Sequence, residues 1–323
     1  MAIFPHRPLG RSGLAVTTLG VGGGTLATGG GREQTIAMLD ACWQAGLRYY
    51  DTAPLYGESE STLGFFLSAK ARQSYVLSTK IGRLPAPVGT RHFDFSREAV
   101  ETSVTTSLNN LATDYIDILA VHDLTPAMLG DDFDRSRQIL LDETIDYLIT
   151  LKDEGTVRAL GLALYDCDAA LQCLRTRAFD SVMIVSAYTL LCHDALASLL
   201  PYCEKHQIGV LVASPLHTGL LATGSVDGAR FNYQPASTDT LRRVDRIEEV
   251  CAHHGVRLHA AALQFPLLHP AVAGVVVGHQ TPGEVATSVK RLNEPIPVAF
   301  WEDLVRKGLL PNDAPIVLSA TSL

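Results

Sequence analysis

The chain alternates short apolar, β-branched segments with amphipathic segments of about ten to fifteen residues, and this alternation restricts its fold more than any other feature. Strands are expected near residues 19–23, 48–51, 75–80, 115–121, 157–163, 181–186, 208–213 and 272–277. Helices are expected near residues 33–46, 59–70, 96–111, 142–154, 168–177, 194–206, 239–254 and 281–292. Eight such units predict an α/β fold: a single (β/α)8 TIM barrel, with residues 1–323 forming one domain and long loops at its C-terminal face.

Length and composition agree with one large domain. The 323 residues exceed the usual size of a single hydrophobic core, but α/β barrels of this length fold as one domain. Hydrophobic residues make up 47% of the chain and charged residues 19%, as is typical of a globular protein with a large core. The sequence has no apolar run of membrane-spanning length and no signal-peptide core near Met1. We therefore expect a cytoplasmic protein that does not bind membranes.

Cysteine spacing, histidine spacing and net charge disfavour several classes of protein. The six cysteines form no CxxC pair and the eleven histidines form no His-x-His motif, so neither a metal site nor a disulfide framework is expected. A net charge of −8, with no basic run, would repel a nucleic-acid backbone. The expected partner is therefore a small molecule, and the chain is expected to be a monomer or a homodimer.

Four side chains with acid–base chemistry follow three successive predicted strands. Asp51, Lys80 and His122 stand at the ends of the second, third and fourth strands, and Tyr56 comes five residues after Asp51, at a turn marked by Gly57. In a parallel barrel the C-terminal ends of the strands converge on one face, where barrel enzymes carry their active sites. The sequence therefore predicts that the four side chains form one site.

These patterns resemble those of the aldo-keto reductase family: Asp-Thr-Ala-x-x-Tyr-Gly at 51–57, Ser-Thr-Lys at 78–80 and a strand-ending His at 122. The resemblance runs from Leu9 to about Arg291. It is strongest to the branch that contains pyridoxal 4-dehydrogenase and the aldose 1-dehydrogenases that act on fucose-like and galactose-like sugars. It implies a nicotinamide-dependent oxidoreductase in which the four residues are catalytic.

The chemistry of the four residues suits proton transfer coupled to hydride transfer. A phenol has a pKa near 10, and a nearby ammonium favours the phenolate and lowers that value. Tyr56 is thus the expected proton carrier, Lys80 the group that tunes it and Asp51 the anchor of the ammonium. His122 would form a hydrogen bond with the reacting oxygen and orient it.

The resemblance also implies where a dinucleotide binds. The segment 214–219 resembles the Ser-Pro-Leu-x-x-Gly loop that crosses the pyrophosphate, and 278–288 resembles the helix whose N-terminus holds the adenosine phosphate. The segment 161–166 lacks the Ser-Asn pair with which the family commonly holds the carboxamide. The expected cofactor-binding residues are Gly23, Gly24, Ser186, Ser214, Leu216, Gly219, Gly278, His279, Gln280, Glu284 and Ser288.

Cofactor preference depends on the charge beside that last helix. Members that prefer NADP have a Lys or Arg on this turn and early helix, but this chain has none between Gly278 and Lys290. Glu284 would accept hydrogen bonds from a ribose and repel a 2′-phosphate, which favours NAD over NADP. Glu284 also fits a capping box with Thr281, and this second interpretation stays open.

Residues in and around the group of Asp51, Tyr56, Lys80 and His122, here called the tetrad, are the candidates for contact with the substrate. Tyr56 and His122 are expected to contact it, and Asp123 is a candidate for either a ligand contact or a loop cap. The segments 124–140 and 216–237 are expected to be long loops; we favour walls of the binding site over inert insertions, because both segments follow strand C-termini.

The sequence favours one reaction over two alternatives. We expect oxidation of a cyclic hemiacetal, an aldose such as L-fucose, L-galactose or D-arabinose, or pyridoxal, to a lactone. A general NADPH-dependent aldehyde and ketone reductase is the first alternative, which Glu284 disfavours. A cofactor-binding regulatory subunit is the second, which the intact tetrad disfavours.

Overall fold

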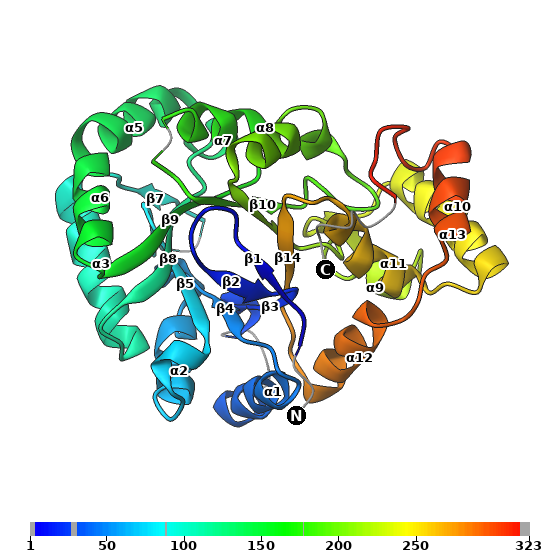
Figure 1. Ribbon diagram of the computed structural model, residues 1–323, viewed down its shortest axis with the longest axis horizontal. Helices are drawn as coiled ribbons and strands as arrows, with labels where there is room; N and C mark the ends of the chain where they lie inside the picture. The colour runs from blue at the N-terminus through cyan, green and yellow to red at the C-terminus, as the bar shows by residue number, and fades with distance from the viewer. Residues whose placement is uncertain (1–3, 27–30, 88, 177, 317–323) are drawn as a thin grey trace.

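A computed structural model describes residues 4–26, 31–87, 89–176 and 178–316. Within them, eight parallel strands close into a barrel, and helices surround it (Figure 1). The barrel strands are β3 (Leu19–Gly22), β4 (Tyr49–Asp51), β5 (Val76–Ile81), β8 (Ile116–His122), β9 (Val157–Leu164), β10 (Ser181–Val185), β11 (Gly209–Ala213) and β14 (Val272–Val277). Neighbours in the barrel follow chain order, and β14 pairs with β3 to close it. The predicted α/β barrel is confirmed.

The strands are nearly continuous apolar runs because both of their faces are covered. All six residues of β14 and all seven of β8 are buried. One end of the barrel interior is filled by an N-terminal hairpin of β1 (His6–Pro8) and β2 (Ala15–Thr17), which lies across the ring of strands in Figure 1. Its residues Leu9, Leu14 and Val16 pack against inward-facing residues such as Tyr49 and Met183.

Each of the eight expected helices is present. They are α1 (Arg32–Gln44), α2 (Ser59–Leu67), α3 (Arg97–Leu111), α6 (Ile145–Asp153), α7 (Cys167–Leu174), α8 (Leu199–His206), α10 (Thr238–His254) and α12 (Pro282–Leu292). Two helix starts predicted from sequence are confirmed by caps: Ser96 Oγ accepts a hydrogen bond from Ala99 N, and Thr281 Oγ1 accepts one from Glu284 N. The expected helix start at residue 194 was wrong, because the 3-10 turn η6 (Asp194–Leu196) precedes α8.

The segment after β8 differs most from its expectation. We expected a loop over 124–140, but it forms α4 (Pro126–Leu129), the 3-10 turn η4 (Gly130–Asp132) and α5 (Phe133–Ile139). The π-helix η5 (Leu140–Thr144) then leads directly into α6. Phe133 and Leu140 are buried in the main core, so tertiary packing makes this segment helical despite its Pro, Gly and Asp residues.

Further elements were not expected from the sequence. There are two short hairpins: β6 (Arg83–Leu84) pairs with β7 (His92–Phe93) directly after β5, and β12 (Arg230–Phe231) pairs with β13 (Gln234–Pro235) after α9. The other elements are η1 (Gly23–Thr25), η2 (Pro54–Tyr56), η3 (Arg72–Ser74), α9 (Leu220–Thr223), α11 (Leu258–Gln264), η7 (Phe265–Leu268) and α13 (Val298–Arg306). Helix α13 packs against α10 in the outer layer, as Figure 1 shows at the right. From the sequence we expect the Pro-rich segment 294–323 either to close the catalytic face or to fray; α13 lies within it, and 317–323 lie outside the described residues. No helix in the described part of the chain has the length and apolarity to span a membrane.

Close packing of α2 on α3 depends on Gly64 and gives a test of the outer layer. A Cβ atom at Gly64 would lie 2.2 Å from Asn110 O, so Gly64→Ala should force the helices apart and lower the unfolding free energy by roughly 1–3 kcal/mol. Gly283→Ala in α12 is the matched control, since the nearest atom would lie 3.8 Å away. We expect the control to stay within about 1 kcal/mol of the parent protein in urea denaturation followed by circular dichroism. Equal stability of the two variants would contradict this account of the helix contact.

Candidate active site

The barrel brings the four predicted side chains to one end. Asp51 ends β4, Lys80 lies near the end of β5 and His122 ends β8; the three strands are neighbours in the barrel. Tyr56 lies on η2, which a hydrogen bond from Tyr56 N to Ala53 O helps to form. Gly57 ends this turn at a positive φ of 58°, a conformation that glycine adopts without steric cost.

A buried ion pair joins two of these strands. Lys80 Nζ lies 2.6 Å from Asp51 Oδ2 and donates a second hydrogen bond to Thr52 O at 2.8 Å. The other carboxylate oxygen of Asp51 accepts a hydrogen bond from Ser78 Oγ at 2.6 Å, and Tyr49 OH lies 3.0 Å from Ser78 Oγ. Burial alone would lower the pKa of Lys80, but Asp51 and Tyr56 outweigh burial and raise it. Lys80 is therefore held as an ammonium.

Tyr56 is the partly exposed member of the group, whereas Asp51, Lys80 and His122 are buried. Lys80 Nζ lies 4.8 Å from the centroid of its ring. Burial raises the pKa of Tyr56, the charge of Lys80 lowers it, and Asp51 raises it again; the net shift is upward. The expected downward pull of Lys80 is present, but the expected net lowering was wrong because desolvation of the phenolate is larger. Asp51 thus raises the pKa of Tyr56, whereas Lys80 lowers it.

His122 faces Tyr56 across the site and is held neutral. The two rings meet edge to face, with centroids 5.8 Å apart and an interplanar angle of 89°. Burial, followed by the charges of Lys80 and Arg83, lowers the pKa of His122 well below 6.5. Its Nδ1 is buried without a hydrogen-bond partner among the described residues. An unprotonated Nδ1 leaves only a lone pair unsatisfied there, so we assign the proton to Nε2, where it can be donated.

Asp123 follows His122 directly and pairs with Arg83 of hairpin β6–β7. Arg83 Nη1 donates to Asp123 Oδ2, and the same oxygen lies 3.8 Å from His122 Nε2. The Asp123 side chain is only 2% exposed. Burial raises the pKa of Asp123, and the charge of Arg83 opposes that rise. The structure places Asp123 beside His122 and pairs it with Arg83; both interpretations of Asp123, as a ligand contact or as a loop cap, stay open.

Two of the predicted cofactor residues line a cavity of about 250 Å³ at the ends of β10 and β11. Ser186 and Ser214 follow these strands, and both have left-handed backbones, with φ of 57° and 55°. Non-glycine residues rarely adopt this conformation, and it is often found at functional sites. The cavity is lined by Met128, Tyr165, Val185, Ser186, Ser214, Thr218, Asn232 and Tyr233.

The segment 216–237 forms one wall of this cavity, and a buried histidine anchors it. His217 Nε2 lies 2.6 Å from Thr189 Oγ1, and His217 Nδ1 lies 2.9 Å from Asn232 Oδ1. The ring also stacks on Phe231 at 4.6 Å between centroids. Leu216 is partly buried against the core, and Gly219, with φ of 95°, precedes α9. The expectation that 216–237 is a long loop was wrong in part, since α9 and hairpin β12–β13 lie within it.

The N-terminus of α12 is already engaged by its own residues. Glu284 Oε2 accepts a hydrogen bond from Gln280 N at 2.7 Å, so the carboxylate caps the turn that was expected to face a phosphate. His279 Nε2 lies 3.0 Å from Ser288 Oγ, and both side chains are buried. Gly278 is exposed, and a Cβ atom there would lie 2.7 Å from Thr25 Cγ2. Gln280 and Glu284 remain the polar side chains that face outward from this turn.

The glycines after β3 lie next to the tetrad. Gly23 is buried, and a Cβ atom there would lie 2.5 Å from Asp51 O, so the backbone can pass this close only at glycine. At Gly24 the nearest atom to such a Cβ would be Tyr56 Cζ at 4.0 Å. Gly24 therefore borders the phenol, whereas Gly23 serves packing.

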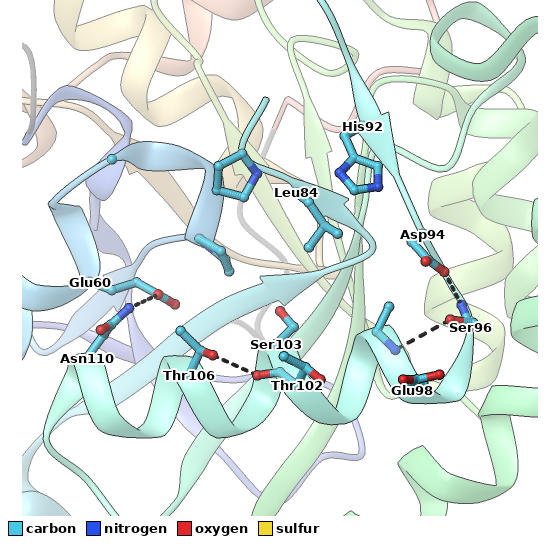
Figure 2. A pocket seen from close by; sticks show the side chains of 14 residues that line it. Glu60, Leu84, His92, Asp94, Ser96, Glu98, Thr102, Ser103, Thr106 and Asn110 are labelled. Carbon is cyan, nitrogen blue, oxygen red and sulfur yellow. Dashed lines mark hydrogen bonds between the residues drawn. The ribbon is translucent and has the colours of Figure 1, made fainter. Parts of the chain in front are cut away.

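A larger cavity, of about 790 Å³, lies outside this site, between hairpin β6–β7, the turn after β4 and helix α3 (Figure 2). Ser103, Thr106 and Asn110 line it from α3. Glu60 is held there by hydrogen bonds with Thr79 Oγ1 at 2.7 Å and Asn110 Nδ2 at 3.2 Å. None of the tetrad residues lines this cavity.

Comparison with known proteins agrees with this geometry. The model of the aldo/keto reductase family matches residues 18–307. The chain belongs to the aldo/keto reductase family. It is 34% identical to D-threo-aldose 1-dehydrogenase of a Pseudomonas species, over 93% of this chain and 96% of that protein. Pyridoxal 4-dehydrogenase of Microbacterium luteolum is 31% identical, over 94% and 97%.

A solved structure shows the same barrel. The aldo-keto reductase of Bacillus halodurans in its holo form superposes with a TM-score of 0.78 at 25% identity, covering 99% of this chain and 100% of that one. The aldo/keto reductase described here is therefore an oxidoreductase with a (β/α)8 barrel, and the family uses nicotinamide cofactors.

Sequence reasoning missed Arg83 and did not name Asn232 or Thr218 as lining residues. Arg83 comes three residues after Lys80, so its position after the strand end was a usable signal. Its partner, Asp123, lies 40 positions away and became evident only when β5 and β8 were paired. Asn232 reaches the cavity from the turn of hairpin β12–β13, which has no marked sequence signature, and Thr218 reaches it from the segment between β11 and α9.

The opposing charges on Tyr56 give a test. Lys80→Met removes the charge that lowers the pKa of Tyr56 and leaves burial and Asp51 unopposed. We expect the acid limb of the pH profile of kcat/KM for oxidation to move to higher pH, because less phenolate forms at any given pH. Lys205→Met, at an exposed position on α8, is the control and should leave the profile in place. A Lys80→Met profile that coincides with the control would show that Lys80 does not tune the phenol.

Proposed function

We propose that this aldo/keto reductase oxidises a cyclic hemiacetal to a lactone with NAD, using Tyr56 as the proton carrier. The single observation that carries the proposal is the arrangement of the site. An ammonium fixed by Asp51 lies 4.8 Å from the Tyr56 ring, and a neutral His122 lies across from it. Two relatives carry names that support the substrate class, an aldose 1-dehydrogenase and a pyridoxal 4-dehydrogenase.

The residues around the tetrad suit a dinucleotide. The cavity beside Ser186 and Ser214 adjoins the tetrad end of the barrel and is lined by hydroxyl and amide groups that can bind a phosphate or a carboxamide. We propose Gly24, Ser186, Ser214, Leu216 and Gly219 as the residues around its nicotinamide and pyrophosphate. The cofactor, when bound, supplies a ring carbon that accepts the hydride.

The proton follows a path that the side chains define. The phenolate oxygen of Tyr56 takes the proton of the hemiacetal hydroxyl and becomes a phenol, and the charge of Lys80 stabilises the phenolate that must be present for this step. Asp51 holds Lys80 charged and in place. His122 donates a hydrogen bond from Nε2 to the same substrate oxygen, which fixes the C–H bond in one direction. This division of roles is consistent with Tyr56 being the member of the tetrad that is partly exposed.

We propose NAD as the preferred cofactor because a carboxylate occupies the place where a 2′-phosphate would need a cation. Glu284 accepts the hydrogen bond of Gln280 N and so satisfies an N–H group at the turn before α12. A phosphate there would displace or repel this carboxylate. The capping role and the NAD preference are therefore compatible interpretations of one residue. A cytoplasmic monomer or homodimer remains our expectation from the sequence.

The reaction can be tested with matched substrates. With NAD in excess, the protein should oxidise L-fucose, L-galactose, D-arabinose or pyridoxal faster than a primary alcohol of similar size, because the rigid ring presents the C–H and O–H groups without freezing further rotors. Tyr56→Phe should lower kcat by about 10²–10⁴-fold and keep the affinity for NAD. Steady-state absorbance of the reduced cofactor and calorimetric titration of NAD measure the two effects. Strong NADPH-dependent reduction of aliphatic aldehydes, with no cyclic hemiacetal oxidised, would instead assign a general carbonyl reductase.

Cofactor choice has its own test in Glu284→Arg. The substitution replaces a carboxylate with a guanidinium that can bind a 2′-phosphate, so kcat/KM with NADP should rise relative to that with NAD. Glu284→Gln is the control: it removes the charge and adds no cation, and should shift the ratio less. A parent protein that already prefers NADP by about tenfold, or about 1.4 kcal/mol, would contradict the assignment.

A further inference from the structure

The ion pair between Arg83 and Asp123 has no role in the proton path, yet it adjoins the catalytic histidine. Asp123 Oδ2, which accepts from Arg83 Nη1, lies 3.8 Å from His122 Nε2. Among the described residues, Asp123 makes no hydrogen bond through Oδ1, and Arg83 donates only from Nη1. A carboxylate oxygen and further N–H groups thus remain for a ligand, next to the group that binds the reacting oxygen.

The backbone holds both members of the pair in place. Asp123 has a left-handed φ of 52°, and its N–H donates to Ala163 O at 3.0 Å. This conformation is uncommon for a residue other than glycine, and it turns the chain sharply at the end of β8. Residues held in sparsely populated backbone conformations cluster at active sites and ligand-binding sites.

Hairpin β6–β7 positions Arg83 from the other side. Gly82 has a φ of 89°, and a Cβ atom there would lie 2.1 Å from the Phe95 ring. Asp94 N donates to Gly82 O at 2.9 Å, and Phe93 stacks on Phe95 at 6.2 Å. The guanidinium of Arg83 lies 5.7 Å from the Phe93 ring centroid. Arg83 is thus held by a packed support and an ion pair, unlike a freely moving surface arginine.

We propose that Arg83 and Asp123 together bind the hydroxyl group on the carbon next to the reacting carbon of the substrate. This inference rests on the proposed function and narrows it to substrates that carry a 2-hydroxyl group. A hydroxyl donates to the free oxygen of Asp123 and accepts from a free N–H of Arg83, so both charged partners are satisfied at once. Asp123 Oδ2 lies 3.8 Å from His122 Nε2, which holds the reacting oxygen. The carbon that carries the 2-hydroxyl group is one bond from the reacting carbon, so its hydroxyl comes close to the ion pair.

The charge of the pair indicates which substrates fit. Arg83 and Asp123 together carry no net charge, so they favour a neutral polyol over an anion. Without a hydroxyl in this position, the desolvated carboxylate oxygen and N–H groups would lose contact with water and gain no partner. Substrates that lack the hydroxyl are therefore rejected mainly in binding.

Three small aldehydes test the proposal in the direction of reduction: propanal, lactaldehyde (2-hydroxypropanal) and 3-hydroxypropanal. We expect the parent protein to prefer lactaldehyde over propanal by about tenfold to hundredfold in kcat/KM, mostly through KM, with a smaller preference for 3-hydroxypropanal. In Arg83→Gln and in Asp123→Asn the ratio of lactaldehyde to propanal should fall by about tenfold, and the double variant should resemble the single ones. Arg97→Gln, at an exposed position on α3, is the matched control and should keep the parent ratio.

The kcat/KM values for the three aldehydes and the affinity for the reduced cofactor together distinguish a substrate contact from a structural role. Loss of local structure would lower kcat/KM for all three aldehydes together and weaken the binding of the reduced cofactor, which we measure by fluorescence titration. An unchanged ratio of lactaldehyde to propanal in both single variants would overturn the proposal. A parent protein that reduces aldehydes but oxidises no cyclic hemiacetal would overturn the proposed function, while these ratios would still decide the role of the pair.

Discussion

The site depends on the buried ion pair between Lys80 and Asp51. Two opposite charges are removed from water between neighbouring strands, and each is compensated by further hydrogen bonds, from Ser78 to Asp51 and from Lys80 to Thr52 O. Removing one partner would leave the other charge buried without compensation, which typically costs about 3–5 kcal/mol. Such a pair persists only where barrel closure holds both strand ends in register. The buried charge of Lys80 therefore depends on the barrel geometry that holds the two strand ends together.

The other groups take their protonation states from this pair. Lys80 opposes the effect of burial on Tyr56 and adds to the effect of burial on His122, so the same ammonium favours the phenolate and keeps the imidazole neutral. The charge of Arg83, like that of Lys80, lowers the pKa of His122. Two ion pairs, Lys80 with Asp51 and Arg83 with Asp123, thus surround the phenol and the imidazole. Each pair is neutral as a unit, which suits an uncharged substrate.

The hairpin that fills the barrel interior and the tetrad lie at opposite ends of the barrel. The hairpin of β1 and β2 fills one end with Leu9, Leu14 and Val16, whereas the tetrad lies where the strands end. The segments after the strands carry unusual conformations, such as the left-handed Asp123, Ser186 and Ser214. Strained residues of this kind persist only where the surrounding structure fixes them, and His217 provides that support for the wall after β11.

The sequence by itself determined the barrel, and each expected strand lies within one residue of the observed one, because strands buried on both faces must be apolar throughout and helices between them must be amphipathic. It also placed Asp51, Lys80 and His122 at one end of the barrel, since a strand end fixes the face to which its last polar side chain belongs. Tertiary structure decided what depends on contacts between distant residues. The segment 124–140 is helical because Phe133 and Leu140 are buried in the core. Arg83 pairs with Asp123, which follows a neighbouring strand and lies 40 positions away in the sequence. The pKa of Tyr56 is raised by desolvation, which depends on burial and cannot be predicted from a local sequence pattern. The physical reason is that strand and helix periodicity is local, whereas burial and charge pairing are properties of the assembled barrel.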